Sequence, residues 1–542
     1  MIIASLNSRY FLNIYRRFIY WFARRLLLFA SIGTLLVSFS ARAYNLNRAI
    51  DISEDEAEYL NISHAIANHF HIELFGTPFF LHPPLFFFFE ALYLKIYSPG
   101  GQLIDQIYSA RYLVVIAGAF SAVALVHIVR YVAGWKASIA ALALFAIDPY
   151  IVFLNSQNLL ETPAMLWVLL GYWLLLSSCV SGDLLRPTRP RALAIGLLFG
   201  LALLTKDTTA FLTIAPLGAL FLINWSLPRR ITALILISAC ITYAPYPIIT
   251  AAVGQWSNFS RQKFAGLERV LGIVQITGFH HPGAPSFTST LIARLGLFGA
   301  TYAIVLAGVI AVAVQVYLGG ARNRLVAMWV ASAYGYLGFA IIQGTLEPQF
   351  FYFLVVPAIV STTCAASQLL TKEWSGPSSK LIPGLLLPLF VLVLGWGGYN
   401  WTRVHFLAGD SYGEALTYIN ARIPPDQRQV AATSQTGQFL LGAYSAPPWG
   451  DWTTAAQLAK YRPYYVLIGI HQVVWDHAQA APALQAWLHI NATLVFTVVS
   501  NGTGTDGPLL LYRLPWAPDN VAHMSSAMKS IRTITGPLPQ QE

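Results

Sequence analysis

The chain has 542 residues, of which 56% are hydrophobic and only 10% are charged. Soluble domains carry roughly 25% charged residues, so this composition leaves too little polar surface to cover a water-soluble protein of such length. The formal net charge of +10 lies mostly in short basic clusters between apolar runs, and it therefore does not indicate a nucleic-acid partner. The expected class is a polytopic α-helical membrane protein.

Apolar runs long enough to cross a hydrocarbon core of about 30 Å recur from residue 18 to residue 399. Basic residues fill every second gap between these runs, as the positive-inside rule predicts for cytoplasmic loops. We therefore expect about eleven transmembrane helices in the cell inner (plasma) membrane, with the N-terminus inside and the C-terminus outside. The predicted spans are residues 18–41, 111–130, 137–154, 160–179, 192–205, 208–225, 231–252, 293–318, 325–343, 350–370 and 381–399.

Two exterior loops are predicted within the transmembrane domain, which covers residues 1–399. The first loop, residues 43–110, is far longer than a connection requires, and such loops are usually functional. Its aromatic run at 84–96 is too short to cross the membrane and is expected to lie in the interface. The second loop, residues 253–292, carries several charged or titratable side chains, namely Arg261, Lys263, Glu268, Arg269, His280 and His281.

After residue 400 the hydropathy falls, and short apolar, β-rich segments alternate with helical patterns. This alternation predicts an α/β domain over residues 400–515, and the expected topology makes that domain extracytoplasmic. Residues 516–542 are expected to form a weakly ordered tail. The predicted strand segments are 428–433, 464–470, 493–499 and 508–513.

An acidic patch formed by Glu54, Asp55, Glu56 and Glu58 follows the first predicted span. Carboxylates crowded at a low-dielectric boundary repel one another, so at least one should have a raised pKa or a cationic partner. One of them could act as general base for an acceptor hydroxyl or amine, or the patch could help bind a divalent cation. The alternative is a solvated acidic loop at the membrane surface.

Other charged residues stand at the outer mouths of the predicted spans. Glu161 either faces a cavity or stabilises a helix N-terminus. Lys206 either neutralises a lipid phosphate or pairs with the adjacent Asp207, and His82 either serves the phosphate or caps the interfacial helix. Glu347 opens the tenth span. Because all of these mouths face one compartment, a shared site explains them together.

Six short motifs occur in order along the chain: Asp55-Glu-Ala-Glu-Tyr59, His82-Pro-Pro-Leu85, Ser109-Ala-Arg-Tyr112, Ala146-Ile-Asp-Pro149, Asn158-Leu-Leu-Glu-Thr-Pro163 and Leu203-Leu-Thr-Lys-Asp-Thr-Thr209. Each alone is degenerate, but their order and spacing resemble the glycosyltransferase C superfamily. The resemblance is specifically to its protein O-mannosyltransferase (family 39) and lipid A aminoarabinose transferase (family 83) members.

The resemblance implies a polyprenyl- or dolichyl-phosphate sugar donor and inversion at the anomeric centre. It implies that Asp55 is the catalytic base with Glu56 beside it, and that Glu161 lines the cavity. The aminoarabinose transferases contact phosphate through a basic residue near the Pro-Pro motif, where this chain has His82 and no lysine. The candidates for donor phosphate binding are His82, Lys206, Arg261 and Lys263, and those for lining the cavity are Tyr59, Glu347 and Tyr352.

The leading hypothesis is an integral membrane glycosyltransferase. It would move a sugar from a polyprenyl-phosphate donor among the membrane lipids to an extracytoplasmic acceptor, which is a protein, a lipid or a glycan. No cofactor is assigned, and a divalent cation stays open. The alternative is a non-catalytic, glycosyltransferase-like subunit of a membrane complex, because His82 and Glu347 depart from the family pattern. A transporter is disfavoured, since the conspicuous charges lie at the outer mouths rather than at the midplane.

Overall fold

The computed structural model divides the chain into two compact units, Met1–Ser411 with Ser500–Thr505 and Tyr412–Val499 with Asp506–Glu542. The residues described are 25–97, 100–274, 286–372, 378–442, 454–470, 481–499 and 508–518. His280, His281, most of the predicted tail and the start of the first predicted span lie outside them.

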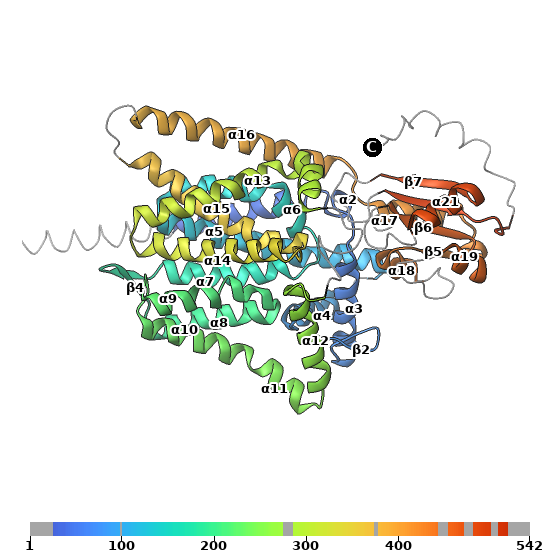
Figure 1. Cartoon of the computed structure of the whole chain (residues 1–542), viewed down its shortest axis with the longest axis horizontal. Helices are drawn as coiled ribbons and strands as arrows, with labels where there is room; N and C mark the ends of the chain where they lie inside the picture. Colours follow the sequence, from blue (N-terminus) through green and yellow to red (C-terminus); the bar gives the residue numbers. More distant parts are fainter. Residues whose placement is uncertain are drawn as a thin grey trace, which may run out of the picture. The chain divides into compact units, whose positions relative to one another are not determined.

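The first unit is a bundle of helices (Figure 1). Seven helices among the described residues are long and apolar enough to cross a membrane. They are Arg25–Ala43, α5 (Leu103–Ile147), α10 with α11 (Arg229–Tyr243 and Pro245–Ala252), α13 (Phe287–Leu318), α14 (Ala321–Ile342), α15 (Pro348–Thr371) and α16 (Ser378–Phe406).

The four other predicted spans take a different form. The span predicted at 137–154 forms the second part of α5 and continues into α6 (Pro149–Asn155). Gly134, whose positive φ of 83° interrupts the helical backbone, separates it from the span predicted at 111–130. The other three form apolar helices shorter than the 20 or so residues that a crossing needs. They are α7 (Glu161–Leu176), α8 (Arg189–Thr205) and the pair η1 (Asp207–Phe211) with α9 (Ile214–Ile223). The count of eleven therefore stays a prediction.

Small residues let the helices of this unit approach closely, as is usual where lipid offers no hydrophobic driving force. Gly196 and Gly200, four residues apart on α8, lie against α10. A Cβ atom added to Gly196 would stand 2.4 Å from the Cβ of Ser238, and one added to Gly200 would stand 2.4 Å from that of Thr242. Any larger residue at either glycine would therefore separate the two helices.

The two ends of the bundle carry different elements (Figure 1). One end carries the hairpin β3 (Cys179–Ser181) with β4 (Leu184–Arg186). The other carries α2 (Leu46–Ala49), α3 (Glu54–His69), the short pair β1 (Glu73–Leu74) and β2 (Thr77–Pro78), α4 (Leu85–Tyr97) and α12 (Trp256–Val270). With 13 residues, α4 is about 20 Å long, which is too short to cross a ~30 Å core.

The second unit contains α17 (Ser411–Arg422), η2 (Pro425–Gln427), α18 (Gln435–Leu440), α19 (Ala455–Tyr461) and α21 (Ala481–Asn491) beside a four-stranded sheet. The strands are β5 (Val430–Ala432), β6 (Tyr465–Gly469), β7 (Thr493–Val498) and β8 (Leu509–Arg513), in the order β5-β6-β8-β7. Strand β5 runs parallel to β6, and the other pairs are antiparallel. These strands fall within the four predicted segments, while the extracytoplasmic location of the unit stays a prediction.

The predicted topology can be tested with cysteines at exposed sites of α19 and β3. In a chain lacking its three native cysteines, Ala459→Cys should react with a membrane-impermeant maleimide in intact spheroplasts. Ser181→Cys should react only after lysis, because the hairpin lies in a gap that the positive-inside rule assigns to the cytoplasm. Both residues are exposed. Labelling of Ser181→Cys before lysis, or protection of Ala459→Cys, would invert the topology.

Candidate functional site

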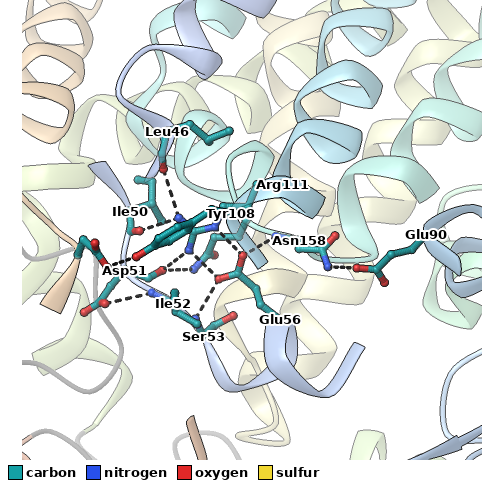
Figure 2. Close-up of polar contacts among 12 residues, drawn as sticks. Leu46, Ile50, Asp51, Ile52, Ser53, Glu56, Glu90, Tyr108, Arg111 and Asn158 are labelled. Atoms are coloured by element: carbon teal, nitrogen blue, oxygen red, sulfur yellow. Dashed lines mark hydrogen bonds and ion pairs between the residues drawn. The ribbon is translucent and has the colours of Figure 1, made fainter. Parts of the chain in front are cut away.

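A buried ion pair fixes the start of α3 against α5 (Figure 2). The Glu56 and Arg111 side chains are both fully buried, and two guanidinium nitrogens of Arg111 donate to the two carboxylate oxygens of Glu56 at 2.8 and 2.9 Å. The Glu56 carboxylate also accepts the backbone N–H of Ser53 at 3.0 Å and that of Asn158 at 2.7 Å. With four donors, this carboxylate is saturated, and its geometry is that of a positioning group.

The remaining Arg111 hydrogens hold the segment that leads into α3. They reach the carbonyl oxygens of Ile50 at 2.8 Å, Asp51 at 3.0 Å and Leu46 at 3.3 Å. A guanidinium is suited to this task because its five donors stand in a fixed planar fork. One side chain of α5 therefore fixes both the approach to α3 and its first turn.

A second buried contact connects this arrangement to α4 (Figure 2). Glu90 accepts a hydrogen bond from the amide of Asn158 and another from the Ser63 hydroxyl at 2.6 Å. Burial raises the pKa of Glu90 to about 7, although both hydrogen bonds oppose the shift. Asn158 thus bridges two acids, since its backbone binds Glu56 and its side chain binds Glu90.

Asp55 stands beside Glu56 in the first turn of α3 and is only partly buried. Desolvation raises the pKa of Asp55 to about 6. Among nearby charges, Lys206 and Arg269 lower this pKa, with Lys206 having the larger effect, and Glu161 and Glu347 raise it. The structure therefore brings Asp55 within electrostatic reach of four charged residues that lie far from it in the sequence.

Three cation–carboxylate pairs involve the charged residues that lie near Asp55 or His82. The first joins Lys206, at the end of α8, to Glu161, at the start of α7, and both are buried. The second joins Lys263 of α12 to Asp207 of η1, with Nζ and Oδ2 2.5 Å apart. A third joins Arg269 of α12 to Glu347, the residue before α15. Sequence reasoning paired Lys206 with Asp207 as one alternative, whereas the structure gives each a different partner.

His82 and Tyr59 also belong to this region. Their rings meet edge to face with centroids 5.9 Å apart, and the Tyr59 ring lies 5.4 Å from that of Phe87. Burial lowers the pKa of His82 well below its usual value, and Lys206, Lys263 and Arg269 lower it further. The imidazole is therefore neutral at pH 7, which suits a hydrogen-bonding residue better than the phosphate counter-charge considered from the sequence.

Two predicted site residues lie in different surroundings. Arg261 is exposed on α12 and donates to the side chain of Asn258 at 3.0 Å. The Tyr352 hydroxyl accepts a 2.8 Å hydrogen bond from Asn155, which also accepts from Arg42. This polar network is fully buried among the helices, so the Tyr352 hydroxyl has a structural partner there, and its role in lining a cavity stays a prediction.

The sequence did not single out Arg269 and Asp207 as members of the site. In the sequence, Arg269 is one of several basic residues in the second exterior loop, and Asp207 stands out only as the neighbour of Lys206. Their partners, Glu347 and Lys263, are separated from them by 78 and 56 positions. The sequence shows charged residues of both signs at the outer mouths of the predicted spans. It does not specify which basic residue pairs with which carboxylate.

The cations and carboxylates of this region compensate one another in pairs. Glu161, Asp207 and Glu347 each already face a basic side chain, so they offer little uncompensated charge to a divalent ion. Within the described ranges, no group of three or more His, Cys, Asp or Glu side chains is arranged to hold a metal. The same pairs compensate Lys206, Lys263 and Arg269, so an anionic ligand must displace a resident carboxylate to bind them.

Comparisons with known proteins agree with the predicted fold. Residues 81–249 match the model of a family described as dolichyl-phosphate-mannose-protein mannosyltransferase. A search of curated proteins found no match. Two solved structures have similar folds, and together with the family model they confirm the resemblance to membrane glycosyltransferases of the glycosyltransferase C type.

The first of these structures is the archaeal oligosaccharyltransferase AglB from Archaeoglobus fulgidus, in complex with an inhibitory peptide and a dolichol-phosphate. It has a TM-score of 0.53 and 14% identity, over 85% of this chain and 72% of that one. The second is ArnT from Cupriavidus metallidurans bound to undecaprenyl phosphate, with a TM-score of 0.51 and 13% identity, over 91% of this chain and 98% of that one.

The buried ion pair should be essential to stability. Arg111→Met leaves the Glu56 carboxylate buried without its cation, so the free energy of unfolding should fall by about 3–5 kcal/mol. Denaturant unfolding in detergent micelles would measure the loss. The matched control is Arg261→Met, which changes an exposed arginine and should cost less than about 0.5 kcal/mol. Adding Glu56→Leu to Arg111→Met should recover part of the loss. Equal stability of the two single variants would contradict the assignment.

Proposed function

We propose that the protein is a membrane glycosyltransferase that moves a sugar from a polyprenyl-phosphate donor to an extracytoplasmic acceptor with inversion. The observation that carries this proposal is that Lys206 and Arg269 act electrostatically on Asp55, whose pKa is raised to about 6, and that both join Lys263 around His82. A phosphate leaving group needs cations, and the acceptor needs a base close to them.

The proposed reaction is a single displacement at the anomeric carbon. The acceptor hydroxyl or amine attacks that carbon while its proton passes to the Asp55 carboxylate. The bond between the carbon and the phosphate oxygen breaks, and the electron pair leaves with the polyprenyl phosphate. At neutral pH a carboxyl group with a pKa of about 6 is mostly ionised, yet it is more basic than an ordinary aspartate.

The three ion pairs suggest how the donor binds. Each cation already has a carboxylate partner, so a donor phosphate must take over part of that bonding. The pair between Lys263 and Asp207 is more accessible than that between Lys206 and Glu161, and we expect it to rearrange more easily. The Glu161 Oε2 atom is buried without a hydrogen-bond partner among the described residues, which suits a hydroxyl of the sugar.

Glu56 has a supporting role in this proposal, although the resemblance places it beside the base. Its oxygens are occupied by Arg111, Ser53 and Asn158. It therefore orients the first turn of α3, and Asp55 with it. The non-catalytic alternative predicts that the protein transfers no sugar, whether or not Asp55 is replaced.

Asp55→Asn should lower sugar transfer by about 10²-fold or more, because the amide keeps the size of the side chain but cannot accept the acceptor's proton. The measurement is transfer of labelled sugar from a purified polyprenyl-phosphate donor in liposomes, with thermal unfolding as the check on folding. Full transfer by Asp55→Asn would remove the base assignment. No transfer by the wild type with any donor sugar would favour the non-catalytic alternative.

The pH profile provides the control for this assignment. A base with a pKa of about 6 must lose its proton to act, so kcat/KM should fall as pH drops below that value. Glu90 titrates nearby, with its pKa at about 7. If Asp55 causes the fall of kcat/KM at low pH, Glu90→Gln should keep that fall. Loss of the fall in Glu90→Gln would instead identify Glu90 as the group that titrates.

Lys263→Gln should raise the KM for the donor about 10- to 100-fold with little change in kcat, since a charge-assisted hydrogen bond contributes about 1.5–3 kcal/mol. The control is Arg261→Gln on the same helix, because Arg261 is exposed and bonded to Asn258. Both variants remove one positive charge from α12, so a difference between them reports position rather than net charge. Equal KM values for the two variants would contradict phosphate binding by Lys263.

A further inference from the structure

Helix α12 has three distinct sides. Its inner side carries Phe259, Lys263 and Arg269, which contact the rest of the first unit. A polar flank carries Ser257, Arg261 and Glu268, all exposed or partly so. The third side is an apolar stripe at helical spacing, formed by Trp256, Phe264, Leu267 and Leu271.

The apolar stripe is exposed to an extent that water would penalise. The exposed fractions are 52% for Trp256, 64% for Phe264, 50% for Leu267 and 40% for Leu271. By contrast, Lys263 and Arg269, on the side of the helix that faces the rest of the first unit, are engaged in ion pairs. A soluble surface rarely gathers large apolar side chains in this way.

The surroundings of the stripe identify what covers it. It follows directly on the exposed apolar side chains of α10 and α11, among them Ile241, Ile248 and Val253, on a segment long and apolar enough to cross a membrane. In Figure 1, α12 crosses the end of the bundle, at a large angle to bundle helices such as α8 and α14. A helix in that orientation at the end of a transmembrane bundle lies along the membrane surface.

We propose that α12 is embedded in the membrane interface, with Trp256, Phe264, Leu267 and Leu271 in the acyl region and Arg261 at the lipid phosphates. Such a helix buries its apolar side to a depth of about 5–10 Å, and tryptophan is enriched at that level. The bilayer then forms the outer support of Lys263 and Arg269. Their amino and guanidinium groups are held at the depth where the phosphate of a membrane lipid would lie.

The test measures immersion directly and does not depend on activity. In a chain carrying Cys179→Ser, Cys240→Ser and Cys364→Ala, Phe264→Cys is labelled with the fluorophore NBD. The matched control is Ala265→Cys, because Ala265 is exposed and turned by about 100° around the helix from Phe264, away from the stripe. The labelled full chain is placed in vesicles of phosphatidylethanolamine and phosphatidylglycerol, with or without doxyl-labelled phosphatidylcholine. Leu267→Cys provides a second position on the stripe should Phe264→Cys fold poorly.

We expect doxyl lipid to quench the label at 264 several-fold more than the label at 265, and aqueous iodide to show the reverse order. Equal quenching by iodide at both positions would place the stripe in water and overturn the proposal. Protection of position 264 from both quenchers would overturn it too, because a protein partner or a second copy would then cover the stripe. Either outcome leaves the proposed transfer reaction to its own experiments.

Discussion

The ion pair between Glu56 and Arg111 is the contact on which the rest of the site depends. An arginine buried inside a helical bundle must have its charge and its donors satisfied, and Glu56 with the carbonyl oxygens of Leu46, Ile50 and Asp51 does this. Satisfying Arg111 forces the chain before α3 into one path. The same contacts place Asp55, the next residue to Glu56, at the end of the bundle.

Charge in this region is arranged in pairs of a cation and a carboxylate. Lys206, Lys263 and Arg269 each face a carboxylate, which lowers the cost of holding basic groups near lipid. The same pairing makes the proposed site responsive, because an incoming phosphate and the resident carboxylates compete for the same donors. Two of the three cations belong to α12, so the position of this one helix controls both.

Much of the architecture could be predicted from residue patterns, because lipid imposes a simple rule on composition and the strands of the second unit carry a clear apolar signature. The predicted spans 231–252 and 293–318, for example, correspond to α10 with α11 and to α13. The short helices α7 and α8 were harder to classify, since neighbouring helices rather than length determine where they end. The pairings of Asp207 with Lys263 and of Arg269 with Glu347 could not be derived, because they join loops whose proximity only the folded bundle creates.

The central claim is that Lys206, Lys263 and Arg269 receive a lipid phosphate. A structure of the protein in lipid nanodiscs with a polyprenyl phosphate would test it most directly. The account predicts phosphate density in contact with Lys263 and Arg269, within reach of Lys206, and with Asp55 on the side from which an acceptor would approach. Lipid phosphate bound elsewhere, with the three ion pairs intact and Asp55 turned away from it, would contradict the account.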